Sequence, residues 1–429
     1  MNKLISEHFP SIPAKQWKQK IQFELQGADY QKELIKIDND GISHLPFYTN
    51  ENVDRSFSVQ FPEYYFLGNS IPVLDVEKAN NEALQAIQTG ANCIYFTIYN
   101  VETDFFDLCK NIDVPVFFNT YFINASFPIK NDLITYLSDP IGKIVKTGNW
   151  YRSFEYDFKQ LNLIIESHPD CLSIDLSIFQ NAGATPVQQL SYTLGQLIDY
   201  ASNIDLTKIR SVNYKVSVSP DFFVEIAKLK ALRILHNAFF KAKNVEVSCN
   251  LIQFKSKRTI QIFNEKLNKE LTLLETEIGI LGGVNFFIFT QENDYFKENT
   301  SRCDDIFKRV NSSNFCKNKN IHDAIYIETL TQQLIEKSTA LIDIIKKGGG
   351  FTKQLQKGLI QQKIAEKAKK EQLEFDQKFK LSEPVNDLIS TKYPFYKENS
   401  KSTLWKPVKE RRLAAPKEKP IWYKLFKYD

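Results

Sequence analysis

Residues 175–201, DLSIFQNAGATPVQQLSYTLGQLIDYA, join an apolar run to a long amphipathic pattern and decide the fold. The run that they continue, residues 171–177 (CLSIDLS), is short and apolar, which is typical of a strand buried on both faces. Downstream, apolar residues recur at helical spacing at Val187, Leu190, Leu194, Leu197 and Ile198. A strand, a tight Ala-Gly-Ala turn and a helix form the half-unit of a βα barrel, whose ligand-facing loops follow the carboxyl ends of the strands.

The same alternation extends from about residue 70 to residue 290. We predict seven strands, at residues 71–76, 93–99, 114–120, 171–177, 212–218, 245–252 and 284–289, and an eighth near residues 142–150. Helical patterns lie between them, for example at residues 77–89 and 226–240. Strands that alternate with helices predict a parallel sheet, either closed into a barrel or open and doubly wound.

Composition limits the class of protein. The 429 residues are 43% hydrophobic and include 33 Phe and 19 Tyr, enough for a large core, and the net charge of +4 says little about partners. Six cysteines are widely spaced without a C-x-x-C motif, which favours reduced thiols in the cytosol. No apolar stretch of about 18 residues and no signal-peptide pattern occurs, so we predict a soluble cytoplasmic protein without membrane contact.

The common catalytic motifs are missing. The five histidines do not form His-Glu-x-x-His, and no Gly-x-Ser-x-Gly elbow occurs. The glycines at 348–350 are followed by neither of the phosphate-loop patterns. Asp175 and Ser177 could act as an acid and a nucleophile on one side of a strand, but a polar layer inside the barrel is the favoured interpretation.

Two segments resemble the methylmalonyl-CoA mutase family, which are cobalamin-dependent isomerases. Residues Gln180, Ala182, Gly183 and Ala184 match the family's Gln-x-Ala-Gly-Ala run, whereas the Tyr-His pair before it falls on Ser177 and Ile178. Residues 222–235, FFVEIAKLKALRIL, are similar to a family helix almost position by position, and Arg233 on its buried stripe needs a carboxylate or carbonyl partner. The resemblance implies a (β/α)8 TIM-type barrel with an N-terminal arm and a C-terminal helical extension.

Looser matches extend the resemblance along the chain and suggest its divisions. A Trp17-containing helix and the turn at residues 46–49 resemble the family's entry segment, and Tyr326, Glu328, Leu330 and Thr331 resemble a segment after its barrel. We predict an arm at 1–50, a barrel at 51–320, a helical extension at 321–381 and a basic-aromatic tail at 382–429. An apolar arm of this kind packs on its own barrel or on a partner.

The groups that serve the family's chemistry are absent. None of the five histidines lies in the Asp-x-His-x-x-Gly motif that supplies the lower cobalt ligand. The family's Gln-Thr-Ser-Gly run is replaced by residues 250–255, NLIQFK, and the Arg of its Asn-x-x-Arg-Thr motif, matched at residues 268–272, is Leu271. We therefore predict no catalytic, cofactor-binding or metal-binding residues in this chain.

The resemblance implies the non-catalytic small subunit of a heterodimeric, adenosylcobalamin-dependent methylmalonyl-CoA mutase. Its catalytic large subunit would bind the cofactor and interconvert methylmalonyl-CoA and succinyl-CoA, while this chain stabilises it. The alternative is an acyl-CoA-binding barrel, or an acyl-CoA mutase that works with a cobalamin domain on a separate chain. For the tail, which holds ten Lys or Arg and four Asp or Glu from residue 395 onward, docking on a neighbouring subunit is favoured over nucleic-acid binding.

Overall fold

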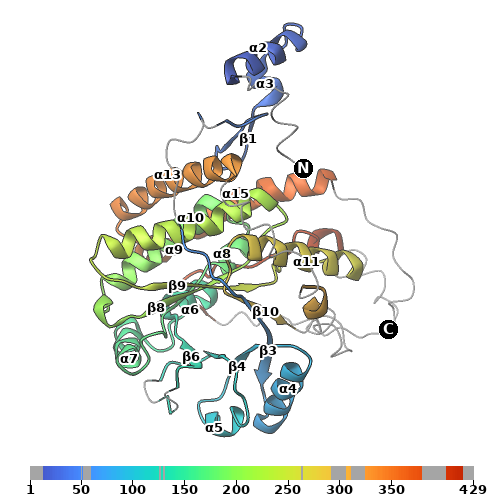
Figure 1. The fold of residues 1–429 in the computed structure, drawn as a ribbon. Helices are drawn as coiled ribbons and strands as arrows, with labels where there is room; N and C mark the ends of the chain where they lie inside the picture. Colours follow the sequence, from blue (N-terminus) through green and yellow to red (C-terminus); the bar gives the residue numbers. More distant parts are fainter. Residues whose placement is uncertain are drawn as a thin grey trace, which may run out of the picture.

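Eight parallel strands form one sheet in the computed structural model, which describes residues 13–49, 51, 59–124, 127–128, 131–261, 264–290, 306–310, 324–378 and 402–418. The strands are β3 (Phe66–Val73), β4 (Cys93–Ile98), β5 (Val116–Thr120), β6 (Ile134–Leu137), β7 (Ser173–Asp175), β8 (Ser211–Val216), β9 (Ser248–Phe254) and β10 (Phe286–Thr290). Their order is β6-β5-β4-β3-β10-β9-β8-β7, and a parallel bridge between Ser138 and Leu172 joins the two ends. The sheet therefore closes into a (β/α)8 TIM-type barrel, as predicted (Figure 1).

The predicted eighth strand was wrong. Most of residues 142–150 belong to helix α6 (Pro140–Thr147), and the strand is β6, a few residues earlier. Asp139 caps the helix by accepting a hydrogen bond from the Gly142 amide at 2.7 Å, and Pro140 occupies the first helical turn. This start signal outweighs the apolar content of the segment, because proline is favoured in the first turn of a helix.

Strand β3 begins earlier than predicted, at Phe66 instead of residue 71. The missed half contains Gly68, which sequence patterns treat as a strand breaker. In the barrel this glycine allows β3 to lie close to β4, because a Cβ at residue 68 would be 2.5 Å from the backbone oxygen of Cys93. The glycine is thus part of the strand pairing.

Helices cover the outside of the barrel. Those within it are α4 (Val76–Gln88), α5 (Phe105–Leu108), α6, α7 (Phe154–Ser167), α8 (Ser177–Ala182), α9 (Pro186–Ala201), α10 (Phe222–Lys241) and α11 (Glu265–Leu281). After the last strand come α13 (Ile325–Lys347), α14 (Phe351–Gln356) and α15 (Leu359–Lys378). The helices predicted at residues 77–89 and 226–240 correspond to α4 and α10.

Helix α10 lies between the barrel and a second layer of helices. Figure 1 shows α13 above α10 and α9, which in turn lie above β8 and β9. Arg233 of α10 donates to the Cys249 carbonyl at 2.9 Å and to Asn285 Oδ1 at 2.7 Å, so the predicted carbonyl partner is confirmed. Lys230 of α10 forms a buried ion pair with Glu328 of α13. The extension after the barrel is therefore packed onto α10 by both apolar and charged contacts.

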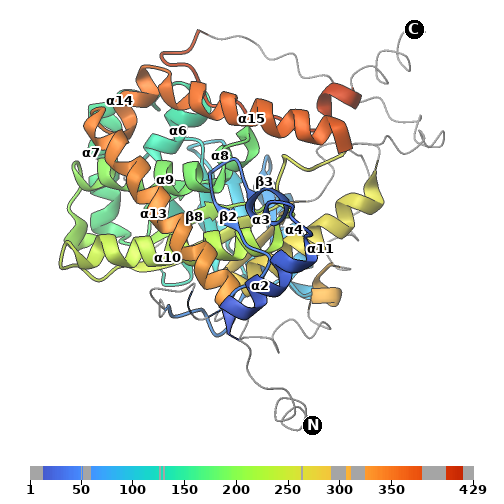
Figure 2. The same cartoon turned by 90° about the horizontal axis from the view of Figure 1, so that it is seen from above.

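The N-terminal arm consists of α2 (Ala14–Glu24), α3 (Tyr30–Leu34) and a hairpin of β1 (Lys36–Ile37) and β2 (Ser43–His44). Helix α2 has no buried residue, and its Phe23 side chain is 85% exposed. Figure 1 shows α2 and α3 projecting beyond α13, whereas Figure 2 shows α14 and α15 lying along the body of the molecule. None of the described helices is long and apolar enough to cross a membrane.

Candidate functional site

The stretch around Gly183 lies at the C-terminal end of the barrel, where ligands of this fold bind. Strand β7 ends at Asp175, so Ser177 begins α8 and does not continue the strand as predicted. Both the amide and the hydroxyl of Ser177 donate to Asp175 Oδ1, at 2.9 and 2.5 Å. Asp175 and Ser177 are thus brought together by a turn and not by one strand face, and their polar groups satisfy each other.

The Gln-Asn-Ala-Gly-Ala turn is used for packing within the chain. The Gln180 side chain accepts a hydrogen bond from Gln189, whose amide also donates to the Ala184 carbonyl at 2.8 Å. Gly183 has a φ of +89°, and a Cβ there would be 2.6 Å from the side chain of Ala368. A left-handed backbone under a close neighbour explains why only glycine fits at this position.

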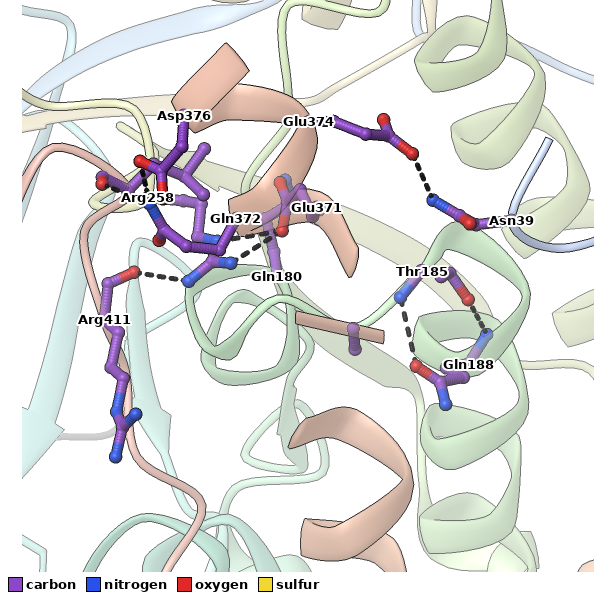
Figure 3. Close-up of polar contacts among 12 residues, drawn as sticks. Asn39, Gln180, Thr185, Gln188, Arg258, Glu371, Gln372, Glu374, Asp376 and Arg411 are labelled. Carbon is purple, nitrogen blue, oxygen red and sulfur yellow. Dashed lines mark hydrogen bonds and ion pairs between the residues drawn. The ribbon is translucent and has the colours of Figure 1, made fainter. Parts of the chain in front are cut away.

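Arg258 is the central contact of the segments that cover this turn (Figure 3). It lies in the loop after β9, and its side chain is 3% exposed. Its Nη2 donates to Glu371 Oε2 of α15 at 2.7 Å, and its Nη1 donates to the Arg411 carbonyl in the tail at 2.8 Å. One guanidinium therefore joins three segments that are distant in sequence.

The N-terminal hairpin reaches the same region. Asn39 donates to Glu374 of α15 at 3.2 Å, and the Asp40 carboxylate accepts a hydrogen bond from the Val187 amide at the start of α9, at 3.0 Å. Thr185 and Gln188 form a capping box beside it (Figure 3). The turn after β7 is thus enclosed by the arm as well as by α15.

The described part of the tail, residues 402–418, packs on its own barrel. The Trp405 ring lies edge-on to Trp150 at 5.7 Å, and the Arg411 amide donates to the Asn181 carbonyl at 2.9 Å. For these residues the prediction of docking on a neighbouring subunit was wrong, because their aromatic and backbone groups are used within the chain. Trp422 and Tyr423, the other aromatic pair of the predicted tail, lie outside the described residues.

Large aromatic rings fill the barrel interior. The Phe66 and Phe286 rings stack at 4.9 Å, the Phe117 ring meets Phe286 edge-on at 4.8 Å, and the Tyr95 ring meets Phe254 edge-on at 5.1 Å. Together with buried aliphatic and cysteine side chains these rings form a core of their own inside the sheet. The axis of the barrel is therefore occupied by protein side chains at the level of these residues.

A polar layer lies near the rings, as the sequence suggested. Lys215 pairs with Asp175 in strand register, and its ammonium donates to Asn119 Oδ1 across the barrel at 2.7 Å. Burial raises the pKa of Asp139 to about 6, although its carboxylate accepts a hydrogen bond from the Tyr200 hydroxyl at 2.6 Å. Because Asp139 also caps α6, its role in this structure is to order the backbone.

The residues in and beside the altered family motifs make structural contacts. Gln253 donates to the Glu275 carbonyl at 2.7 Å, and Asn268 Nδ2 donates to the Gln261 carbonyl at 2.7 Å. Leu271, which stands in the place of the family's Arg, lies in α11. These contacts hold α11 and the loop before it against the barrel.

The described histidines do not offer a cobalt ligand at the mouth of the barrel. His44 Nδ1 lies 3.1 Å from the Tyr326 hydroxyl, and His236 Nδ1 lies 2.9 Å from the Tyr214 hydroxyl. His168 precedes β7 and so lies at the opposite end of the barrel. The described residues also contain no group of three or more His, Cys, Asp or Glu that could hold a metal ion. Among the described residues, these histidines do not fit the lower ligand of a corrinoid.

A cavity of about 560 Å³ opens at that opposite end, the N-terminal end of β6, β7 and β8. Its lining includes Tyr136, His168 and Arg210, and Arg210 Nε donates to the Asp170 carboxylate at 2.7 Å. In barrels of this class the N-terminal end serves stability while ligands bind at the other end. The cavity is therefore separate from the region around Gly183.

Sequence reasoning missed Arg258 and its partners. The residue lies in an ordinary polar loop, and Glu371 and Arg411 are 113 and 153 residues away. The one available signal was the match at Gly183, because a glycine in a tight turn implies that something approaches it closely.

Comparisons with known proteins agree with the resemblance. Residues 135–402 match the methylmalonyl-CoA mutase family. The chain is 25% identical to the methylmalonyl-CoA mutase small subunit of Porphyromonas gingivalis, over 84% of this chain and 67% of that protein. It is 26% identical to the methylmalonyl-CoA mutase of Rhizobium meliloti over 62% of this chain, and spans only 38% of that longer protein. The large subunit of 2-hydroxyisobutanoyl-CoA mutase from Aquincola tertiaricarbonis is 24% identical over 43% of this chain and 36% of its own length.

Proposed function

Because this chain belongs to the methylmalonyl-CoA mutase family, we propose that it is the non-catalytic small subunit of a heterodimeric mutase. Its catalytic partner binds adenosylcobalamin, which supplies the radical chemistry, and interconverts methylmalonyl-CoA and succinyl-CoA. The similarity to a protein named as a small subunit supports this assignment.

The filled barrel is the observation that carries the proposal. The rings of Tyr95, Phe117 and Phe286 lie in the interior, where they would meet an elongated thioester that entered along the axis. At the mouth, Gly183 is covered by Ala368 and Arg258 of the same chain. A barrel that is packed inside and covered near its ligand-facing turn serves as a scaffold.

The exposed arm supports the stabilising role. Helix α2 presents Trp17 and Phe23 without burying any residue, so binding of a partner would remove apolar surface from water. By mass action, a partner at a concentration 100-fold above its dissociation constant stabilises a chain by about 2.7 kcal/mol. The arm is the first place where we expect the large subunit to bind.

The test is to purify this chain alone and together with the large subunit. Alone, with adenosylcobalamin and methylmalonyl-CoA, we expect no turnover, whereas the pair is active and unfolds at a higher temperature than the large subunit by itself. The double substitution W17S/F23S should weaken the pair, and a change of the exposed Leu373 of α15 to Ser is the matched control. Turnover by the isolated chain would reject the proposal.

The second candidate is an acyl-CoA-binding barrel or an acyl-CoA mutase completed by a cobalamin domain on a separate chain. The similarity to a mutase subunit that is itself named a large subunit favours it, as does the polar layer of Asp175 and Lys215. Calorimetric titration of the isolated chain with methylmalonyl-CoA separates the two. Saturable binding that K215M abolishes would support this candidate, and the absence of heat would support the scaffold.

A further inference from the structure

The base of the N-terminal arm is joined to the body through strand β2. The Ser43 amide donates to Gln333 Oε1 of α13 at 2.8 Å. The next residue, His44, has its Nδ1 atom 3.1 Å from the Tyr326 hydroxyl, at the start of α13. Figure 1 shows this hairpin between α3 and α13. A change at His44 therefore acts on the joint between the arm and the barrel.

The residues after His44 support the exposed helix α2. The Tyr48 ring lies 4.6 Å from the Tyr326 ring of α13. On the other side, the Phe47 ring lies 6.4 Å from the Trp17 ring of α2. The segment from residue 44 to residue 48 thus connects α13 to α2, and the position of α2 relative to the barrel depends on how firmly this segment is held.

The His44 imidazole has a carboxylate of the arm and a carboxylate of the body as neighbours. Its Nε2 atom lies 3.6 Å from Asp38 Oδ2 of the same hairpin, and 20% and 27% of the two side chains are exposed. The second carboxylate is Asp221, which precedes α10. Partial burial and the nearby Glu225 raise the pKa of Asp221, as does Asp38, whereas His44 and Lys36 lower it. These side chains therefore lie within electrostatic reach of one another.

The remaining charged and titratable groups described at this joint are paired, neutral or farther along the hairpin. Glu225 forms a buried ion pair with Lys228 of its own helix. Burial raises the pKa of Tyr326 to about 12 and also raises the pKa of Tyr48, so both hydroxyls keep their protons at neutral pH. Lys337 of α13 lies beside the hairpin turn. The charge of the imidazole is therefore the variable one near neutral pH.

Near the imidazole, Asp38 and Asp221 bring two negative charges and Lys36 brings one positive charge. A neutral His44 leaves this group with an excess carboxylate, whereas an imidazolium balances it. Histidine side chains change their charge between about pH 5 and 8, and nearby opposite charges stabilise each other. We propose that His44 is a pH-sensitive latch of the arm. Its protonation fixes the arm to α10 and α13, and its deprotonation loosens residues 43–48, the segment that supports α2.

The latch does not depend on the subunit role, because every contact in it lies within this chain. Its strength is that of a partly exposed ion pair, which changes an equilibrium by about two- to fivefold. The closed latch holds the exposed face of α2 in one position, and the open latch lets it move.

Hydrogen exchange in the full chain between pH 5 and 9 tests the latch. Protection factors, which correct each rate for the intrinsic effect of pH, are measured for the amides of residues 43–45. As the pH rises, we expect them to fall about two- to fivefold more in the unchanged protein than in H44Q, whose side chain is neutral at every pH. Other effects of pH are shared by the two proteins. Protection factors that fall equally in both would overturn the proposal.

A second pair of variants covers the case in which H44Q disturbs the hairpin. D38N removes the facing negative charge but keeps an oxygen that can accept the hydrogen bonds from the Asp40 and Ile42 amides. It should reduce the pH step as H44Q does. E33Q removes an exposed carboxylate from α3 of the same arm and is the matched control, which should keep the full step. A full step in D38N, or its loss in E33Q, would reject the latch.

Discussion

The C-terminal end of the barrel is built differently around β7–β9 than around β3–β5. At the first half, Gly183 lies under Ala368, and Arg258 binds both α15 and the tail. At the second half, Leu74 and Val101 are exposed, and no described segment from elsewhere in the chain covers them. The covered half is specified by close backbone approach and buried polar contacts, whereas among the described residues the exposed half depends mainly on the apolar packing beneath it. Substitutions in the covering contacts of the first half should therefore have large effects, and substitutions of exposed side chains on the second half should have small ones.

The largest effect is expected at the turn after β7. Gly183→Val places a β-branched residue at a φ of +89° and a Cβ 2.6 Å from Ala368. The left-handed backbone costs about 1–2 kcal/mol and the overpacking a further 1–3 kcal/mol, so we expect a loss of about 2–5 kcal/mol in urea unfolding. Gly358→Val is the control, because it has a φ of +76° and no atom within 4 Å of the new Cβ. Equal losses at the two glycines would show that the turn is not covered.

The second effect is expected at Arg258. Arg258→Met removes the donors to Glu371 and to the Arg411 carbonyl, and hydrogen bonds to charged groups contribute about 1.5–3 kcal/mol. The adjacent Lys257 pairs with Glu410 at 3.1 Å but is 52% exposed, so Lys257→Met should change the unfolding free energy by less than about 1 kcal/mol. If Arg258→Met and Lys257→Met lower the unfolding free energy equally in chemical denaturation, Arg258 does not join the covering segments.

The third effect is a pH dependence at Glu275, which lies in α11 below the Arg258 loop. Burial raises the pKa of Glu275 to about 8, although the Ser256 amide and the Thr259 hydroxyl both donate to its carboxylate. The folded state thus holds a proton that the unfolded chain releases above its ordinary pKa of about 4.3. The bound proton stabilises the folded state fully at a pH below about 4.3. This stabilisation is lost as the pH rises through about 8, by at most about 1.4 kcal/mol per pH unit. E275Q should remove this slope from the unfolding free energy measured between pH 5 and 9. If the unfolding free energies of E275Q and of the unchanged protein fall in parallel with pH, this prediction is wrong.

The smallest effect is expected on the exposed half. Phe106 is 62% exposed, and Phe106→Ser should change the unfolding free energy by less than about 0.5 kcal/mol. Its neighbour Phe105, buried beneath the same half with its ring 5.0 Å from that of Phe118, is the control, and Phe105→Ala should destabilise the protein far more than Phe106→Ser. A large loss for Phe106→Ser in thermal unfolding would mean that this half is covered as firmly as the other.

Local patterns predicted most of the barrel. The helices α4 and α10 were placed because their apolar pattern repeats over several helical turns. Seven strands were placed because each is a short apolar run of several residues. The errors fell where a local signal was misread. Pro140, after Asp139, marks the start of a helix that runs into residues 142–150, the segment taken for a strand, and Gly68 concealed half of β3. The first correction comes from a helix cap and the second from contact with a neighbouring strand. Neither is contained in the apolar periodicity of the sequence.

The candidate site was predicted only in part. The match at Gln180 and Gly183 identified the turn, and the polar layer with Asp175 was expected inside the barrel. Ser177 was placed on the strand, whereas it begins α8 and binds Asp175 through a turn. The strand ends there because Asp175 accepts both the amide and the hydroxyl of Ser177, a local bond that competes with strand pairing.

The sequence by itself determined the alternation of strands and helices, the family and the glycine turn after β7, because each depends on residues within a short window. Only the tertiary structure decided what covers that turn. Arg258, Ala368 and Arg411 come from separate segments, and their contacts form only after the barrel has brought those segments to one end. Such contacts depend on distances through space, which a pattern along the chain does not encode.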